Sequence, residues 1–155
     1  MPGEWYKNWI TNKNNSEGAE WIYNNADMFI LFVDCQALVG NERGLAREKI
    51  INLSKRLSSN LDNRAVAVVW SKFKYFQVKD EIKNRIKDEF KRNFKIYKEF
   101  EVNNIPKKDN DEYCYKNIPT VLNWCLEYYK MRSNNLLDLN YQYKAKDLFF
   151  YYKGK

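Results

Sequence analysis

Residues 28–34 read MFILFVD, a continuous apolar run that ends at Asp34. A second run, AVAVVW, follows at residues 65–70. Apolar runs of this length, rich in β-branched and aromatic residues, are typical of strands buried on both faces of a parallel sheet. The segment IYKEFEV at residues 96–102 alternates apolar with more polar residues, which predicts an edge strand with one drier face.

Helical patterns separate these three strands. Two of them repeat apolar residues every three or four positions, and Asp80 is the expected N-cap of the second. A shorter helix is expected at residues 16–24, and NIPTVLNWCLEYYKM at residues 117–131 predicts a helix after the last strand. The repeating residues are Ala46, Ile50, Leu53 and Leu57 in the first pattern, and Ile82, Ile86, Phe90 and Phe94 in the second.

This order of helices and strands predicts right-handed crossovers on a parallel sheet. We therefore expect a three-layer α/β fold with about three parallel strands flanked by helices, in which residues 65–70 lie in the centre. The 155 residues are sufficient for one domain. We assign residues 1–132 to that domain and residues 133–155 to an aromatic tail, ending in DLFFYYKGK, that packs on it.

The composition excludes several classes of chemistry. The chain has no histidine, which removes Ser-His and Cys-His nucleophiles, histidine acid–base catalysis and nearly every catalytic zinc site. The three cysteines, Cys35, Cys114 and Cys125, have no CxxC spacing, which argues against a disulfide framework or a metal site. Apolar runs are too short to span a bilayer, and no secretory signal is visible, so we expect a cytoplasmic protein without membrane contact.

Positive charge is concentrated in one part of the chain. The net charge is +7, and the stretch from Lys72 to Lys98 holds ten basic side chains against four acidic ones. Such a surface can bind nucleic acid or another polyanion. A solvated helix face explains the same pattern and is favoured, because no nucleic-acid-binding motif accompanies the charge. Nucleic-acid binding through Lys79–Lys98 is kept as an alternative.

Four short stretches together resemble the double-GTPase domains of bacterial conflict systems, which have the P-loop GTPase fold. They are MPGEWYKNW at residues 1–9, FVDCQAL at 32–38, VVWSKFK at 68–74 and KDLFFYYKG at 146–154. The first is similar to the end of a DxPG motif, and the third to the NKxD or TKxD motif that contacts guanine. The resemblance spans nearly the whole chain but covers only the later half of a complete GTPase domain.

The resemblance implies a site that binds GTP with magnesium. In that reading Lys72 lies along the guanine beside Ser71, the Gly3 amide meets the γ-phosphate, and Glu4 helps to place the attacking water. The chain departs from the family at Lys74, which stands where the guanine-reading aspartate is expected. No GxxxxGK[ST] motif occurs, and the DxPG aspartate would precede Met1. We therefore expect a fragment that is inactive and without a cofactor when alone, and that binds GTP and magnesium only when it is completed.

Other interpretations stay open for the same residues. Gly3 and Glu4 are also explained by a turn that places Trp5 and Trp9 in the core. Ser71 and Lys72 also fit an ordinary loop after a strand. Asp34 is expected to cap the following turn.

The strand at residues 28–34 raises a second possible function, that of a protein-interaction module. It is apolar and uncharged up to Asp34, which natural edge strands avoid. We expect this edge to be covered by a partner chain, by a second copy, or by the tail at Leu148–Tyr152.

Overall fold

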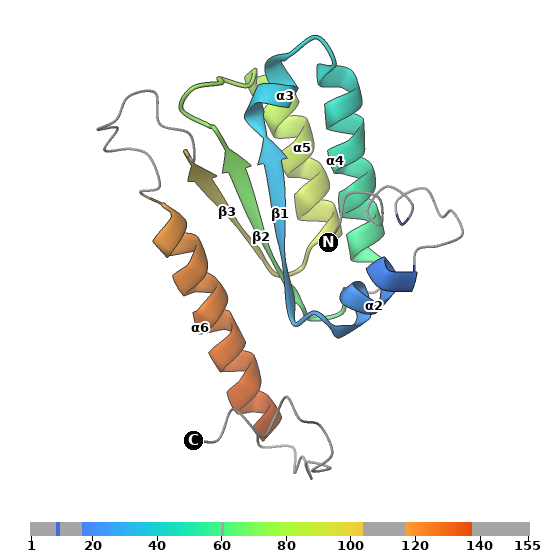
Figure 1. The fold of residues 1–155 in the computed structure, drawn as a ribbon, viewed down its shortest axis with the longest axis vertical. Helices are drawn as coiled ribbons and strands as arrows, with labels where there is room; N and C mark the ends of the chain where they lie inside the picture. The colour runs from blue at the N-terminus through green and yellow to red at the C-terminus, as the bar shows by residue number, and fades with distance from the viewer. Residues whose placement is uncertain (1–8, 10–16, 60, 104–116, 138–155) are drawn as a thin grey trace.

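The computed structural model describes Trp9 and residues 17–59, 61–103 and 117–137, with side chains given up to residue 132. Along these residues one or two helices separate each strand from the next, as Figure 1 shows. Their bounds are α2 Glu17–Asn25, β1 Met28–Asp34, α3 Cys35–Val39, α4 Arg43–Ser58, β2 Ala65–Ser71, α5 Asp80–Asn93, β3 Tyr97–Val102 and α6 Ile118–Leu137.

The three strands form one parallel sheet in the order β1-β2-β3, which confirms the predicted fold class and the central place of the second strand. The register pairs Met28 with Ala65 and Asp34 with Ser71 on one side of β2. On the other side it pairs Ser71 with Val102. All seven residues of β2 are buried, because this strand has a neighbour at both edges and a layer of side chains over both faces.

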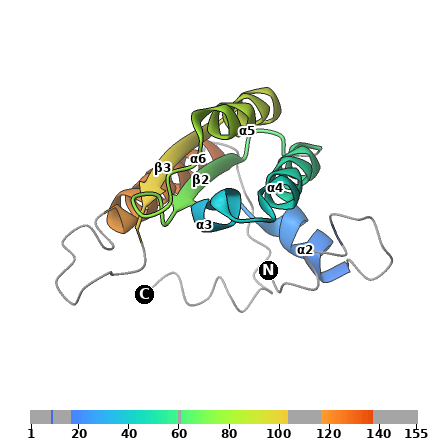
Figure 2. The same ribbon diagram turned by 90° about the horizontal axis from the view of Figure 1, so that it is seen from above.

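Two apolar cores lie on opposite faces of the sheet. The larger contains Leu31, Val33 and Trp70 together with side chains of α2, α4 and α5. Figures 1 and 2 show α4 and α5 together on this side of the sheet. The smaller core, on the other face, packs Val69 and Phe100 against Val121 of α6. The fold thus has the three layers that the sequence predicts.

The bounds of two helices differ from those expected. Helix α5 begins at Asp80, so its N-cap is Lys79, whose side chain makes no capping hydrogen bond. Asp80 and Glu81 instead lie in the first turn, where carboxylates stabilise the positive end of the helix dipole. Helix α6 continues to Leu137, past the domain boundary expected after residue 132. The predicted tail beyond Leu137 lies outside the described residues.

Trp9 belongs to the larger core and is 2% exposed. Its ring lies 5.0 Å from that of Tyr23, and the Arg56 guanidinium lies 5.4 Å from its ring centre. A large aromatic anchor near the amino terminus is therefore explained by packing. Trp5, Gly3 and Glu4 lie outside the described residues.

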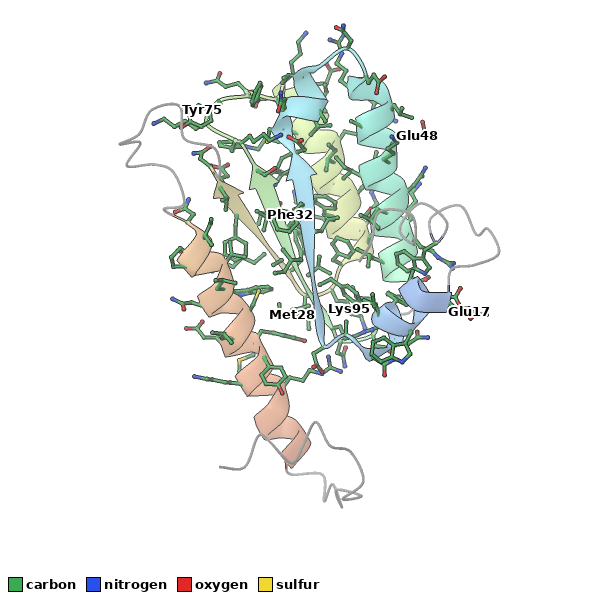
Figure 3. All side chains as sticks on the ribbon, viewed as in Figure 1. Glu17, Met28, Phe32, Glu48, Tyr75 and Lys95 are labelled. Atoms are coloured by element: carbon green, nitrogen blue, oxygen red, sulfur yellow. The ribbon has the colours of Figure 1, made fainter. Side chains whose placement is uncertain are left out.

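The two outer strands of the sheet differ in how they are protected. Strand β3 carries Lys98, Glu99 and Glu101, and the Asn117 side chain donates a hydrogen bond to the Glu101 carbonyl at 2.7 Å. Strand β1 has no charged residue before Asp34, and Phe32, labelled in Figure 3, is 66% exposed. Charges and side-chain bonds discourage further strand pairing, so β3 is protected at its outer edge. Among the described residues, no strand pairs with the outer edge of β1, and we call this edge open.

No helix among the described residues is long and apolar enough to cross a membrane.

Candidate functional site

The candidate site lies where β1 and β2 end side by side. Because the register pairs Asp34 with Ser71, the loops that follow both strands begin next to each other. In open parallel sheets, ligands bind at this carboxyl end of the strands. The structure therefore brings Ser71 and Lys72, two of the predicted site residues, together with Asp34.

Lys72 is held in place from both its backbone and its side chain. Its φ of 58° lies in the left-handed region, which is uncommon for a residue with a side chain. Its carbonyl accepts hydrogen bonds from the Tyr75 and Phe76 amides at 3.1 and 3.2 Å, which closes the turn after β2.

The Lys72 ammonium reaches the end of the neighbouring strand. It lies 2.9 Å from Asp34 Oδ2 and 2.8 Å from Gln36 Oε1, and the side chain is only 18% exposed. Asp34 uses its other oxygen, Oδ1, to accept a hydrogen bond from the Gln36 amide at 3.0 Å, which caps α3. The predicted capping role of Asp34 is confirmed, and pairing with Lys72 is a second role for the same carboxylate.

Ser71 and Cys35 are both turned inward at this end of the sheet. The Ser71 hydroxyl donates to the Val33 carbonyl at 3.3 Å, so its oxygen is engaged within the sheet. Cys35 is fully buried, and this burial, followed by the Asp34 carboxylate, raises the pKa of its thiol to about 11. A thiol with such a pKa is protonated at neutral pH, so Cys35 is not a nucleophile there.

The residues after Lys72 form the outer part of the site. The Lys74 amide donates to Asn103 Oδ1 at 2.8 Å, and the Lys74 residue is exposed. A lysine therefore occupies the position at which the resemblance implies a guanine-reading carboxylate. The Lys83 ammonium of α5 lies 4.2 Å from the centre of the Phe73 ring, a cation–π contact that fixes the loop against α5.

The basic helix α5 is partly neutralised by β3. Lys83 pairs with Glu101 at 3.2 Å, and Lys87 pairs with Glu99 at the same distance. Glu99 also accepts a hydrogen bond from Trp70 Nε1 at 2.9 Å. The prediction that the basic face of α5 is only solvated is corrected here, because two of its lysines form ion pairs with carboxylates of β3. Arg85 lies on the exposed side of the helix.

Two other features of the described residues bear on ligands. No group of three or more histidine, cysteine, aspartate or glutamate side chains in the described ranges is placed to hold a metal ion. A cavity of about 390 Å³ opens beside β3 and is lined by Trp70, Lys87, Glu99, Phe100, Glu101, Asn117 and Thr120. It lies along the edge of the sheet rather than at the ends of the strands that carry Ser71 and Lys72.

Sequence reasoning identified Ser71, Lys72 and Asp34 but not Gln36. The missed signal is the DxQ spacing at the end of β1, which places the Gln36 amide oxygen two residues beyond the capping Asp34. The contact of Lys72 with Asp34 and Gln36 depends on the register between β1 and β2, and a short sequence motif does not predict that register. The candidates Gly3 and Glu4 lie outside the described residues, so they remain expectations.

The backbone strain at Lys72 predicts an order of stability for two variants. Lys72→Ala and Lys72→Gly both lose the partly exposed ion pair with Asp34, a loss of about 1 kcal/mol or less. Only glycine adopts a positive φ without a steric cost, which is about 1 kcal/mol for other residues. Urea unfolding should therefore show Lys72→Gly to be about 1 kcal/mol more stable than Lys72→Ala. Equal stability, or the reverse order, would contradict the left-handed turn.

A family model described as Double-GTPase 2 matches residues 1–125 of the chain. No curated protein and no solved structure matches it.

Proposed function

The chain belongs to the Double-GTPase 2 family, and we propose that its first 132 residues form the base-binding half of a GTPase-like nucleotide-binding domain. The observation that carries this proposal is the fixed position of Lys72. Its ammonium is held by Asp34 and Gln36, and its backbone turns sharply at the carboxyl end of the central strand. This is the part of an open parallel sheet at which nucleotides bind.

The base would be held along Lys72, as the family resemblance implies. Because the Ser71 hydroxyl is bonded to the Val33 carbonyl, Ser71 is expected to act through its backbone rather than through its oxygen. Lys74 in place of an aspartate removes a carboxylate that would accept from the guanine ring. We therefore propose nucleotide binding at this site with weaker discrimination for guanine than an NKxD motif gives.

The phosphates and magnesium require groups beyond those described at this site. Phosphate loops hold nucleotides through backbone amides and a lysine of the GxxxxGK[ST] motif, which the 155 residues do not contain. Gly3 and Glu4 are the candidates of this chain for the γ-phosphate end. We propose that GTP and magnesium bind only when another segment supplies the phosphate loop, and that the chain alone holds no cofactor.

The open edge of β1 is the proposed place for that segment. Strand β3 is protected by its charged side chains and by Asn117, whereas Met28 to Val33 of β1 are uncharged. A strand that pairs with β1 would carry its own carboxyl end next to Asp34 and Lys72. That strand would come from upstream sequence of the same protein or from a partner protein. A second copy of the chain could cover the β1 edge, but it would not complete the site, because it also has no GxxxxGK[ST] motif.

The same edge supports a second candidate function, a non-catalytic interaction module that pairs with a partner strand without binding nucleotide. Binding of nucleic acid through α5 is the weakest alternative, because Glu101 and Glu99 already neutralise Lys83 and Lys87. The resemblance to conflict-system domains supports a cytoplasmic role in such a bacterial system.

Nucleotide binding distinguishes the two main candidates. A segment that carries GxxxxGK[ST] between a strand and a helix, taken from another Double-GTPase 2 member, would be mixed with the chain and titrated with a fluorescent GTP analogue. We expect binding only in the mixture. Lys72→Ala should weaken it by about tenfold or more, since a base contact with a charged group contributes about 1.5–3 kcal/mol.

The matched control is Lys79→Ala, an exposed lysine that precedes α5 and lies outside the site. It should leave the affinity within about twofold. Binding of the segment without any nucleotide affinity would favour the interaction module. Nucleotide affinity that is equal in the Lys72→Ala and Lys79→Ala mixtures would refute the proposed base site.

A further inference from the structure

An apolar strip lies on the sheet face that α6 only partly covers. It consists of Ile30 and Phe32 of β1 and Leu122 and Leu126 of α6, and all four side chains are exposed, Phe32 by 66% and Leu126 by 57%. Their neighbours along the chain, Leu31 and Val33, point into the larger core on the opposite face. Ile30 and Phe32 therefore face the same side of the sheet as α6.

Helix geometry places the two leucines toward β1. The inward stripe of α6 contains Val121 and Cys125, which pack in the smaller core. On one flank of that stripe, Trp124 packs against Phe100 of β3, with ring centres 5.7 Å apart. Leu122 and Leu126, one turn apart, lie on the other flank, which faces β1. The apolar strip thus combines exposed side chains of β1 with those on the flank of α6 that is turned away from β3.

We propose that the aromatic segment Leu148–Tyr152 of the same chain docks on this strip. The segment reads LFFYY, five apolar or aromatic residues in succession, and lysines flank it on both sides. Large exposed apolar side chains gathered on one face of a soluble protein are typical of a binding site. The docking concerns side chains on the face of the sheet, so the backbone groups at the β1 edge stay available for a partner strand.

The end of α6 brings the segment to the strip. Arg132 Nη1 donates to the Asp27 carbonyl at 2.7 Å, so the last part of α6 lies beside the residue that precedes β1. Between Leu137 and Leu148 the chain has ten residues, which reach roughly 33 Å when extended. Strand β1, with seven residues, is about 23 Å long. The segment can therefore reach every part of the strip, at the high effective concentration of a tethered ligand.

The test measures the accessibility of a thiol on the strip in the full chain. Leu126→Cys is the reporter, in a background of Cys114→Ser and Cys125→Ala. Cys35 remains, and its burial keeps it unreactive. Leu45→Cys is the matched control, because Leu45 is 48% exposed on α4, on the other side of the sheet. Alkylation at position 126 should be at least about tenfold slower than at position 45.

The tail variant Phe149→Ser with Phe150→Ser should remove this protection and bring the two rates within about twofold of each other. Equal rates with the natural tail would overturn the proposal. Protection that disappears on dilution would also overturn it, because the strip would then be covered by a second copy.

A cross-link tests the same contact if the serine variant folds poorly. Leu126→Cys combined with Phe149→Cys should form a disulfide within one chain on mild oxidation, and Leu45→Cys combined with Phe149→Cys should not. No disulfide in the first pair, or equal yields in both pairs, would contradict docking on the strip. Neither measurement depends on nucleotide binding, so this inference and the proposed function fail independently.

Discussion

GTP hydrolysis by the purified 155-residue chain should not exceed the background rate, whatever the magnesium concentration. Phosphoryl transfer depends on holding and neutralising the phosphates, and the GxxxxGK[ST] loop that does so does not occur in the sequence. One preorganised donor to a developing charge contributes about 10²–10³ in rate. The loss of a whole loop of such donors therefore removes several orders of magnitude.

Phosphate release from GTP, followed over hours at micromolar chain, measures this directly. Lys72→Ala is the control that assigns any activity to the site. Turnover by the pure chain that disappears in Lys72→Ala would show that these residues suffice for catalysis, and the requirement for a second segment would be wrong.

Replacing Arg64 with methionine should lower the free energy of unfolding by about 3 kcal/mol. Arg64 is 7% exposed, and its guanidinium lies 4.8 Å from the Tyr23 ring centre. It donates to the carbonyls of Leu61, Tyr23 and Ala26. Because the last turn of α2 has no basic residue of its own, Arg64 serves as its C-terminal cap from 39 positions beyond Asn25. Methionine leaves these carbonyls buried without that donor.

Arg56→Met is the matched control for this prediction. Arg56 also lies over an aromatic ring, that of Trp9 at 5.4 Å, but its Nε has no hydrogen-bond partner within the described part of the chain. Arg56→Met should lower the free energy of unfolding by about 1 kcal/mol or less. Urea unfolding of both variants measures these changes. Similar decreases in the free energy of unfolding would mean that ring packing, rather than carbonyl capping, accounts for the contribution of Arg64.

The sheet was predictable because each of its strands is identified by a short run of neighbouring residues. The apolar runs at residues 28–34 and 65–70 are long enough for strands and too short for buried helices, and the helical patterns between them impose parallel crossovers. The alternation at residues 96–102 correctly predicted the charged edge strand, since Glu99 and Glu101 point away from the smaller core. Two of the stretches that carry the family resemblance, FVDCQAL and VVWSKFK, span the carboxyl ends of β1 and β2.

The contacts of the site were less predictable because they depend on register. Lys72 meets Asp34 and Gln36 only because β1 and β2 pair with Asp34 opposite Ser71. The charge of α5 was misjudged for a similar reason. Lys83 and Lys87 read as a solvated face from helical spacing alone, but the adjacent β3 supplies Glu101 and Glu99. Ion pairs between residues distant in sequence depend on tertiary packing, which cannot be predicted from the spacing of residues in a single sequence.

Amide hydrogen exchange in β1 tests the central claim, that this chain is half of a nucleotide-binding domain joined at an open strand edge. The backbone groups of Met28–Asp34 that face β2 are paired, whereas those on the outer side have no neighbouring strand in the described sheet. Exchange would be followed residue by residue in the chain alone, and then with the phosphate-loop segment and GTP. The account predicts that the outward amides of β1 exchange rapidly in the chain alone and become at least about a hundredfold slower in the complex. Nucleotide binding that leaves the β1 amides unchanged would contradict it.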